Sequence, residues 1–240
     1  AAGVSSATAD ISALRTGGAA TALTGGSYAT DNGVAWGWRT AAVTVPDVTA
    51  TDGSMQNFTI SATDVLGNVA TSATQQVEID QTPITAATAS CANAGNANNA
   101  LDVGDTTSWG FGDTVTPSSL LAAWTAGASS TVTGTVVLRD GTSDFIALNT
   151  DLGLTMFSGT AYNSSFDLGA ANWVTADVNI PSSTFSLVDR LTARLAYGTP
   201  ASSIRPRNST NTHYFGTNIR DAAGNAVAAA FTEACTTNAW

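Results

Sequence analysis

Asp64-Val-Leu-Gly-Asn68 and Asp221-Ala-Ala-Gly-Asn225 are two copies of the pattern Asp-x-x-Gly-Asn, and each is flanked by residues suited to strands. An Asp side chain at the first position of a turn accepts hydrogen bonds from backbone N–H groups further along the chain. Gly67 and Gly224, at the fourth position, supply the positive φ that a three-residue hairpin with a bulge requires. The copies begin 157 residues apart (221 − 64). They predict two closing hairpins, one near the end of each of two β modules.

Short segments that alternate apolar and polar residues surround these turns and predict an all-β fold. In residues 55–64, for example, Phe58, Ile60 and Ala62 repeat with a period of two. The predicted strands of the first half are residues 7–14, 34–45, 55–64 and 74–80. Those of the second half are residues 131–139, 145–149, 173–180, 191–197, 214–220 and 228–236. The single helical turn that we predict, residues 117–124, begins with Pro117, which suits the first turn of a helix.

A proline marks the boundary between the two modules. Pro83 follows the last strand of the first half and cannot donate a backbone hydrogen bond to a sheet. The sequence therefore predicts two immunoglobulin-like β-sandwiches in tandem, residues 1–82 and residues 83–240. The second module is the larger, and we expect its excess to form long loops at residues 157–171 and 204–214. Because loops often carry function, any specialised function is expected there.

The composition is that of many extracellular β proteins. The 240 residues are 43% hydrophobic and only 11% charged, and the formal net charge is −10. Such an acidic chain is a poor ligand for nucleic acid or for anionic lipid. All eight basic residues are arginines, and the absence of lysine excludes isopeptide bonds and lysine-dependent pilin polymerisation. No apolar stretch approaches the roughly 20 residues of a membrane span, so we expect no membrane insertion.

Two cysteines and one histidine limit the chemistry of the chain. Cys91 and Cys235 enclose 143 residues (235 − 91 − 1), and in an oxidising compartment we expect them to form a disulfide. Such a bond would contribute about 4–5 kcal/mol by chain entropy; two buried free thiols are the alternative. With His213 alone, a zinc site is not expected. No Gly-x-Ser-x-Gly nucleophile motif is present, so a Ser-His-Asp enzyme is not expected either.

The six tryptophans suggest a core and one candidate surface. Trp36 and Trp38 are two residues apart, so on a strand both rings lie on one face. We favour a core position for this pair, while an exposed pair would form a platform for sugar rings. Trp109, Trp124 and Trp173 are expected to be core residues of the second module.

Calcium is the one cofactor that the sequence leaves open. Asp102, Asp105 and Asp113 lie close together early in the second module, and Asp80 lies just before it. Calcium requires several oxygen ligands, which these carboxylates supply, although no EF-hand loop is present. We expect no other metal or cofactor.

Four segments resemble the closing hairpins and strand-turn motifs of bacterial immunoglobulin-like repeats. They are Ser61-Ala-Thr-Asp-Val-Leu-Gly-Asn-Val-Ala70, Gln76-Val-Glu-Ile-Asp80, Phe111-Gly-Asp-Thr-Val-Thr-Pro-Ser-Ser-Leu120 and Asn218-Ile-Arg-Asp-Ala-Ala-Gly-Asn-Ala-Val227. Such repeats occur in surface proteins, adhesins and large extracellular enzymes. The resemblance implies a β-sandwich architecture and an extracellular or cell-surface setting, and it implies no particular activity.

The functional hypothesis from the sequence is therefore a non-enzymatic structural or adhesive module of a bacterial surface protein or filament. Its expected partners are copies of itself or neighbouring immunoglobulin-like modules, joined through strand edges or module ends. The alternative is a carbohydrate-binding accessory domain that uses exposed aromatic residues to bind host or matrix glycans.

Overall fold

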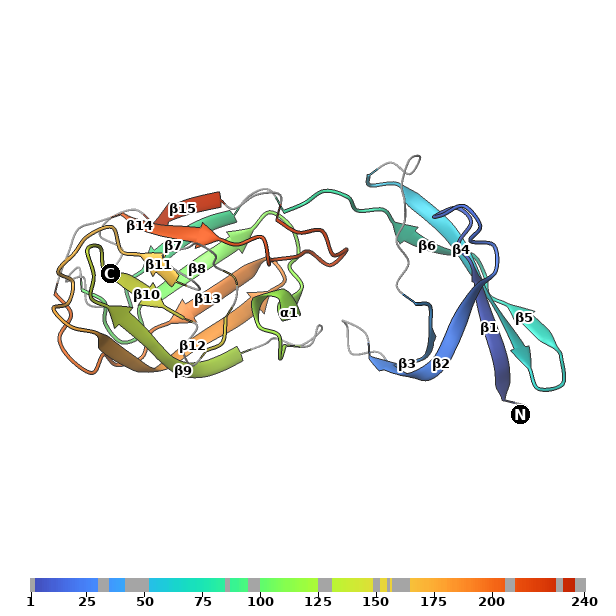
Figure 1. Cartoon of the computed structure of the whole chain (residues 1–240), viewed down its shortest axis with the longest axis horizontal. Helices are drawn as coiled ribbons and strands as arrows, with labels where there is room; N and C mark the ends of the chain where they lie inside the picture. The colour runs from blue at the N-terminus through green and yellow to red at the C-terminus, as the bar shows by residue number, and fades with distance from the viewer. Residues whose placement is uncertain are drawn as a thin grey trace. The chain divides into compact units, whose positions relative to one another are not determined.

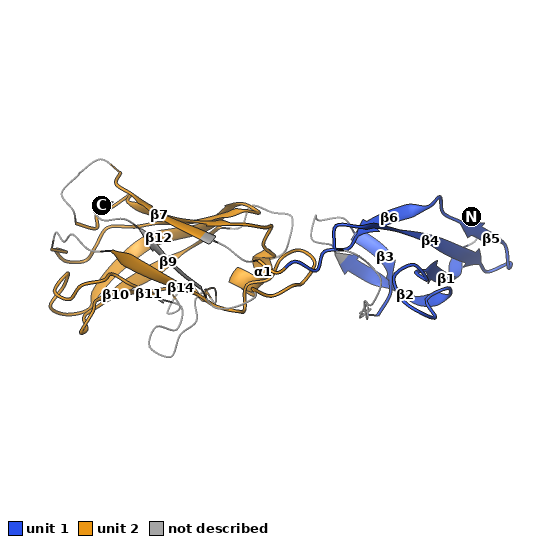
Figure 2. Ribbon diagram, turned by 90° about the horizontal axis from the view of Figure 1, so that it is seen from above, with its two compact units in different colours: residues 1–82 blue, residues 83–240 orange. Residues whose placement is uncertain are grey.

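The chain folds into two compact all-β units, Ala1–Thr82 and Pro83–Trp240, which Figure 2 colours separately. A computed structural model describes residues 3–29, 35–41, 52–84, 87–94, 100–124, 131–148, 152–154, 156, 165–205, 210–227 and 231–235. Within these residues the only helix is α1 (Pro117–Leu120), one turn long and begun by a proline. No helix in the described residues is long and apolar enough to cross a membrane. The predicted all-β fold class is confirmed.

Unit 1 is a single six-stranded sheet (Figure 1). Its strands are β1 (Val4–Asp10), β2 (Thr21–Ala29), β3 (Ala35–Arg39), β4 (Met55–Asp64), β5 (Val69–Thr71) and β6 (Gln75–Glu78). The strand order is β3-β2-β1-β4-β5, and β6 pairs with the first half of β4. All pairs are antiparallel. Strands β5 and β6 thus share one side of β4, and β3 lies at the opposite edge of the sheet.

The core of unit 1 is small. Its buried apolar side chains, among the described residues, are Ala7, Ala9, Ile11 and Ile79. Ala7 and Ala9 point to the same face of β1 because they are two apart, but an alanine side chain removes little apolar area from water. Phe58, Ile60 and Ala62 of β4 are only half-buried. The period-two pattern that predicts β4 therefore yields a strand without a deep core.

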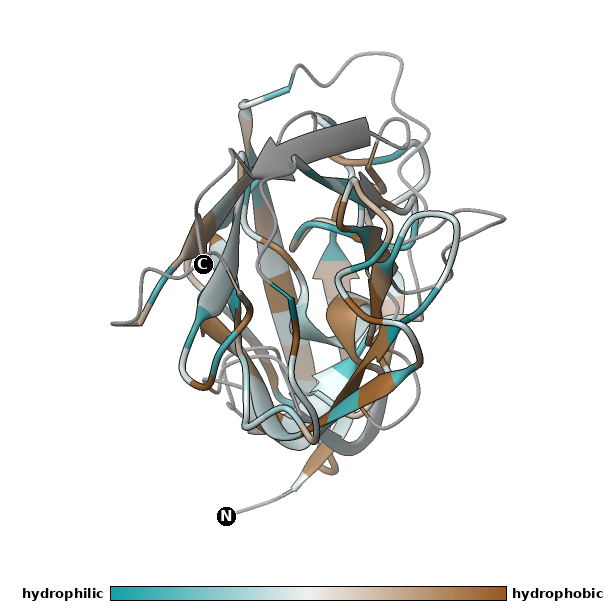
Figure 3. Ribbon diagram, turned by 90° about the vertical axis from the view of Figure 1, so that its left-hand side faces the viewer, coloured by the Kyte–Doolittle hydropathy of each residue, from teal (hydrophilic) through white to brown (hydrophobic). Residues whose placement is uncertain are grey.

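Unit 2 is a nine-stranded sheet that curves until its ends nearly meet. Its strands are β7 (Ala87–Ala92), β8 (Thr106–Phe111), β9 (Thr131–Arg139), β10 (Phe145–Ala147), β11 (Ser165–Asp167), β12 (Val178–Asp189), β13 (Thr192–Ala196), β14 (Asn211–Phe215) and β15 (Phe231–Cys235). The order is β15-β14-β11-β10-β9-β12-β13-β8-β7. Strands β15 and β7, at the two ends of this order, also lie against each other. Figure 3 shows the strands curving around a common interior.

Aromatic residues fill that interior. Strand β8 alternates strictly, so that Thr107, Trp109 and Phe111 point inward. Trp109 is 0% exposed, and its ring meets Phe166 edge-on and Phe185 at a tilt, with centroids about 6 Å away in each case. Trp124 and Trp173 are buried as well, which confirms the three predicted core tryptophans.

Two local features fix the geometry of β12, the longest strand. A bulge interrupts its pairing with β9 between Ile180 and Ser183, and Ser182 takes a positive φ of 60° there. Gly198 passes so close that a Cβ at this position would lie 1.7 Å from the Pro181 carbonyl oxygen.

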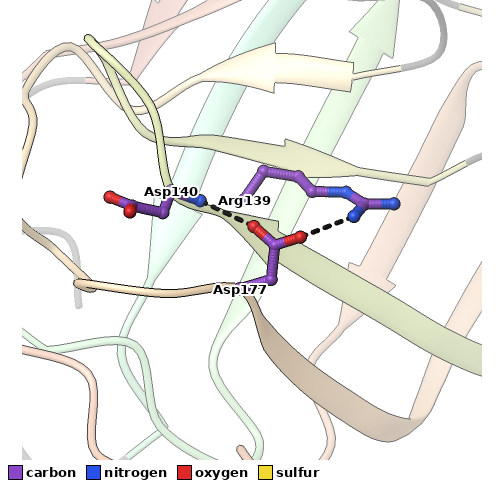
Figure 4. A network of polar contacts seen from close by, with 3 residues as sticks. All are labelled: Arg139, Asp140 and Asp177. Atoms are coloured by element: carbon purple, nitrogen blue, oxygen red, sulfur yellow. Dashed lines mark hydrogen bonds and ion pairs between the residues drawn. The ribbon is translucent and has the colours of Figure 1, made fainter.

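Just before β12, Asp177 accepts hydrogen bonds from Arg139 (2.6 Å) and from the Asp140 backbone N–H (3.0 Å), as Figure 4 shows. These contacts hold the start of β12 to the end of β9.

The structure differs from the sequence-based expectation in several places. Strands β2, β5, β7, β8 and β11 were not among the predicted strands, and β11 lies inside the stretch 157–171 that was expected to be a loop. Strand β14 begins at Asn211, so the expected loop at residues 204–214 ends earlier than predicted. Residues 157–164 and 206–209 are outside the described part of the chain. Each unit is one hydrogen-bonded sheet, and the immunoglobulin-like sandwich topology stays a prediction.

Candidate functional site

Strand β3, at one edge of unit 1, presents aromatic side chains. Trp36 is 52% exposed, which makes the favoured core position wrong for this residue, and Trp38 is half-buried. Tyr28 of β2 pairs with Trp36, and the Arg39 guanidinium lies 4.2 Å from the centroid of the Tyr28 ring. Gly25, opposite Trp38, lets the indole ring lie close to the β2 backbone, since a Cβ there would be 3.4 Å from the ring. The result is an exposed aromatic surface with one cation.

The opposite edge of unit 1 is exposed, mixes apolar and polar residues and carries little charge. All residues of β5 and β6 are exposed, including Val69 and Val77. Val65 and Leu66, in the turn before β5, are also exposed. In the described residues β5 and β6 pair only with β4, so their outer N–H and C=O groups face away from the sheet. Glu78 is the only charged residue in these two strands.

The two Asp-x-x-Gly-Asn turns have the same backbone geometry but different surroundings. In the first, Asp64 accepts hydrogen bonds from the backbone N–H groups of Leu66 and Asn68 and from the Asn68 side chain, and Gly67 has a φ of 85°. The hydrogen bonds from Asn68 hold the pKa of the exposed Asp64 carboxyl below its usual value. The turn connects β4 to β5.

In the second turn the aspartate is buried. Asp221 is 0% exposed, its Oδ1 atom accepts a hydrogen bond from the Asn225 backbone N–H (2.8 Å), and Gly224 has a φ of 96°. The other carboxylate oxygen, Oδ2, is buried and has no hydrogen-bond partner. The backbone of Asp221 also forms an isolated antiparallel bridge with Val115.

Of the four aspartates predicted as calcium ligands, Asp105 has its carboxylate used within the fold. Asp105 is buried, and its carboxylate accepts hydrogen bonds from the backbone N–H groups of Ala94 (2.9 Å) and Asp102 (2.7 Å). Burial raises the pKa of Asp105 against the effect of these two hydrogen bonds. Both carboxylate oxygens of Asp105 are thus occupied by a local turn. Asp80 belongs to unit 1, and its sequence position is three residues before unit 2.

Asp113, the fourth of these aspartates, lies beside a residue that the sequence analysis assigned only to a turn. One carboxylate oxygen of Asp113 and one of Asp221 are within 4.8 Å of each other. The segment that follows Asp113 is tied to the Asp221 turn, because Thr116 N–H donates to the Arg220 carbonyl (2.8 Å) and Thr116 Oγ1 donates to the Asp221 carbonyl (2.5 Å). No local sequence signal joins residues 113 and 221, since their proximity depends on this tertiary contact.

His213 is a core residue of unit 2. It is 0% exposed, lies against the Phe166 ring, and accepts a hydrogen bond at Nδ1 from Trp109 Nε1 (3.2 Å). Desolvation by burial lowers the pKa of His213 to about 3, so the ring is neutral at physiological pH. A histidine in this position cannot exchange protons with a substrate in solvent.

The two predicted disulfide cysteines lie on strands that meet where the sheet of unit 2 nearly closes. Cys91 is in β7 and Cys235 is the last residue of β15. The Cys235 backbone pairs with Asn211 of β14, and the Asn211 side-chain amide donates to Cys91 Sγ (3.6 Å). The side chain of Cys235 lies outside the described residues.

Unit 1 also has an open hollow of about 300 Å³. Its lining consists of Asp10, Ser12, Ala13, Asn57, Phe58, Thr59 and Thr74. Ser12 Oγ donates to Asp10 Oδ1 (2.6 Å), but the only histidine of the chain is buried in unit 2. The hollow therefore holds no histidine base to activate the serine as a nucleophile.

The described residues therefore offer three features that can carry function: the aromatic surface on β3, the exposed edge formed by β5 and β6, and the carboxylate pair of Asp113 and Asp221. No protein-family model and no curated protein sequence matches this chain.

Proposed function

We propose that this chain is a non-enzymatic structural or adhesive segment of an extracellular bacterial surface protein or filament. In this proposal the two units are modules of the immunoglobulin-like class, and they assemble non-covalently with copies of the chain or with neighbouring modules. The observation that carries the proposal is the exposed, nearly uncharged strand edge of unit 1, formed by β5 and β6.

The physical argument starts from what sheet edges require. An exposed strand edge pairs with another chain unless charges, prolines or bulges prevent it. Strands β5 and β6 contain no proline and no lysine, and one charge, Glu78, is too little to repel a second strand. Valines at positions 69 and 77 would bury apolar area if a strand were added there.

The test is the assembly state of the full chain with and without charges on this edge. We expect the native protein to form oligomers or fibres in light scattering and negative-stain images. Replacing both valines, Val69→Lys and Val77→Lys, should reduce assembly strongly without unfolding unit 1, because both positions are exposed. The matched control is Val188→Lys with Leu191→Lys, two exposed positions at the β12–β13 hairpin of unit 2. A native chain that stays monomeric when concentrated would contradict the proposal.

The absence of enzymatic activity is part of the same proposal. It is supported by the burial of His213, whose lowered pKa and hydrogen bond from Trp109 suit a core residue. The net charge of −10 argues against nucleic acid as a partner.

We further propose that Cys91 and Cys235 form a disulfide, as expected of an extracellular protein. Three observations support the pairing: strands β7 and β15 lie against each other, Asn211 contacts both strands, and the described residues contain no free thiol. Intact-mass measurement after alkylation without reductant tests it. We expect no added alkyl group in the secreted protein, and two added groups would contradict the disulfide.

Carbohydrate binding is the second candidate, and the exposure of Trp36 is the observation that favours it. Aromatic rings on a strand bind sugars by stacking against their apolar faces. If β3 is such a platform, Trp36→Ala should abolish binding on a glycan array. The control is Met55→Ala, which removes a side chain of equal exposure from the same unit without removing a ring. Glycan binding that persists in the Trp36→Ala variant would show that β3 is not the binding platform.

A further inference from the structure

The strongest unexplained feature of unit 2 is the carboxylate of Asp221. Its Oδ2 atom is fully buried and has no hydrogen-bond partner, although buried carboxylate oxygens are nearly always paired. Leaving such an atom unpaired in a folded protein is costly. A neighbouring acidic side chain makes the arrangement more unfavourable, since one carboxylate oxygen of Asp113 lies within 4.8 Å of one of Asp221. Two carboxylates this close repel each other, and a cation bound between them would relieve that repulsion.

Neither Asp113 nor Asp221 forms an ion pair with any arginine of the described residues. Arg220 is the immediate neighbour of Asp221 in sequence, but its guanidinium donates instead to the Gly224 carbonyl at 2.8 Å. The chain contains no lysine that could take its place.

We propose that Asp113 and Asp221 bind one calcium ion, which unit 2 holds between the segment after β8 and the turn after β14. The geometry suits this ion, because two oxygens that bind the same Ca²⁺ at 2.3–2.6 Å lie at most about 5 Å apart. The ligands are hard carboxylate oxygens with no nitrogen or sulfur ligand in the group, which disfavours zinc and copper.

The rest of the coordination shell follows from the burial of the two residues. Asp221 is fully buried and supplies Oδ2, while its Oδ1 stays bound to the Asn225 N–H. Asp113 is half-buried, so the ion has access to solvent on that side and water completes its shell. Hydrogen bonds from Thr116 to Arg220 and Asp221 hold the two ligand segments together before the ion binds. The ion therefore links two segments about 100 residues apart in sequence (221 − 113 = 108).

The consequence is a calcium-dependent stability of unit 2. A ligand that binds only the folded state raises the melting temperature in proportion to the logarithm of its concentration. For a domain of this size we expect the unit 2 transition to rise by roughly 5–10 °C at a calcium concentration one hundred times the Kd. The unit 1 transition should not move.

The experiment uses the full chain after treatment with EDTA, followed by dialysis. Isothermal titration with CaCl₂ should show one ion per chain, and scanning calorimetry should show the shift of unit 2. Asp113→Asn and Asp221→Asn should each raise the Kd for calcium at least tenfold. Each should also reduce the calcium-induced shift of the unit 2 transition. Because Asp113 is only half-buried, we expect Asp113→Asn to fold, and it can be measured even if Asp221→Asn does not fold.

The matched control is Asp64→Asn, in the other Asp-x-x-Gly-Asn turn. Asp64 is the equivalent residue, but its two carboxylate oxygens are already bound to Leu66 and Asn68. Calcium binding should be unchanged in this variant. The proposal is overturned if the native chain binds no calcium, if both Asp113→Asn and Asp221→Asn bind it as tightly as the native chain, or if MgCl₂ at the same concentration gives an equal shift.

Discussion

Trp36 and Trp109 are both in short strands at or near the end of their sheets, yet their surroundings are opposite. Trp36 of β3 is 52% exposed, and Trp109 of β8 is 0% exposed, in contact with Phe166, Phe185 and His213. The same contrast holds for the two units as a whole. Unit 2 surrounds a continuous aromatic and aliphatic core, whereas the buried core of unit 1 consists of two alanines and two isoleucines among the described residues.

The difference follows from the closure of the sheets. Nine strands curve until β7 meets β15, so one face of the sheet of unit 2 is enclosed by the sheet itself. The six strands of unit 1 run in an open order from β3 to β5, and few of their described apolar side chains are buried. A domain gains stability in proportion to the apolar area that it buries. Unit 2 is therefore expected to be stable by itself, and unit 1 to depend on what covers or extends its sheet.

Removing one tryptophan from each unit should give the largest difference. Trp109→Ala deletes a fully buried ring and leaves the Nδ1 atom of His213 without its donor, so we expect a loss of about 3–5 kcal/mol in the unfolding free energy of unit 2. Trp36→Ala should cost about 0.5 kcal/mol or less in unit 1, as is usual at exposed positions. Urea denaturation of the full chain measures both. Equal losses would show that Trp36 is covered in solution.

Replacing one glycine in each unit by alanine should give a smaller difference in stability loss between the units. Gly198→Ala would place a methyl group 1.7 Å from the Pro181 carbonyl oxygen. The β12 bulge would have to move to relieve this clash. We expect a loss of about 3 kcal/mol in unit 2, near the upper end of what overpacking costs. Gly37→Ala in β3 meets nothing closer than 4.0 Å and should be close to neutral. Thermal unfolding of the two variants compares them, and a neutral Gly198→Ala would mean that the bulge is mobile.

Features of the fold that arise from a local sequence pattern could be predicted, whereas features that depend on contacts between strands could not. The period of two in β4 and the burial of Trp109, Trp124 and Trp173 were predictable, because alternation and large apolar side chains carry that information directly. Strand β2 was missed because Gly25-Gly26 has the composition of a turn. In the folded unit Gly26 instead makes room for the ring of Tyr28 on the same strand, and Gly25 makes room for the ring of Trp38, a contact that depends on the neighbouring strand β3.

The candidate calcium site shows more clearly what a local sequence pattern cannot predict. Asp64 and Asp221 occupy the same position in the same five-residue pattern, so the sequence assigns both to a hairpin turn. One is exposed with both oxygens paired, and the other is buried with one oxygen unpaired beside Asp113. Burial is a tertiary property, determined here by the bridge between Val115 and Asp221. Asp113 was predictable as an acidic residue near the start of unit 2, but its partner was not.

The smallest effect that we predict is a pH dependence confined to unit 2. His213, the only histidine of the chain, has its pKa lowered by burial to about 3, whereas an unfolded histidine has a pKa of about 6.5. Between these values the unfolded state binds a proton that the folded state does not, so the unfolding free energy falls as the pH is lowered through this window. From pH 7 to pH 5, above the range in which most carboxylates titrate, we expect unit 2 to lose about 2 kcal/mol.

Unit 1 contains no histidine, so its unfolding free energy should be flat over the same range. His213→Gln tests the assignment, because glutamine keeps an acceptor for Trp109 Nε1 and cannot take up a proton. Denaturation of the full chain at pH 7, 6 and 5 should show the slope in the native protein and its absence in the variant. A slope that persists in His213→Gln would mean that another group of unit 2 titrates in this window. A slope in unit 1 would mean that the contrast between the two cores is not its cause.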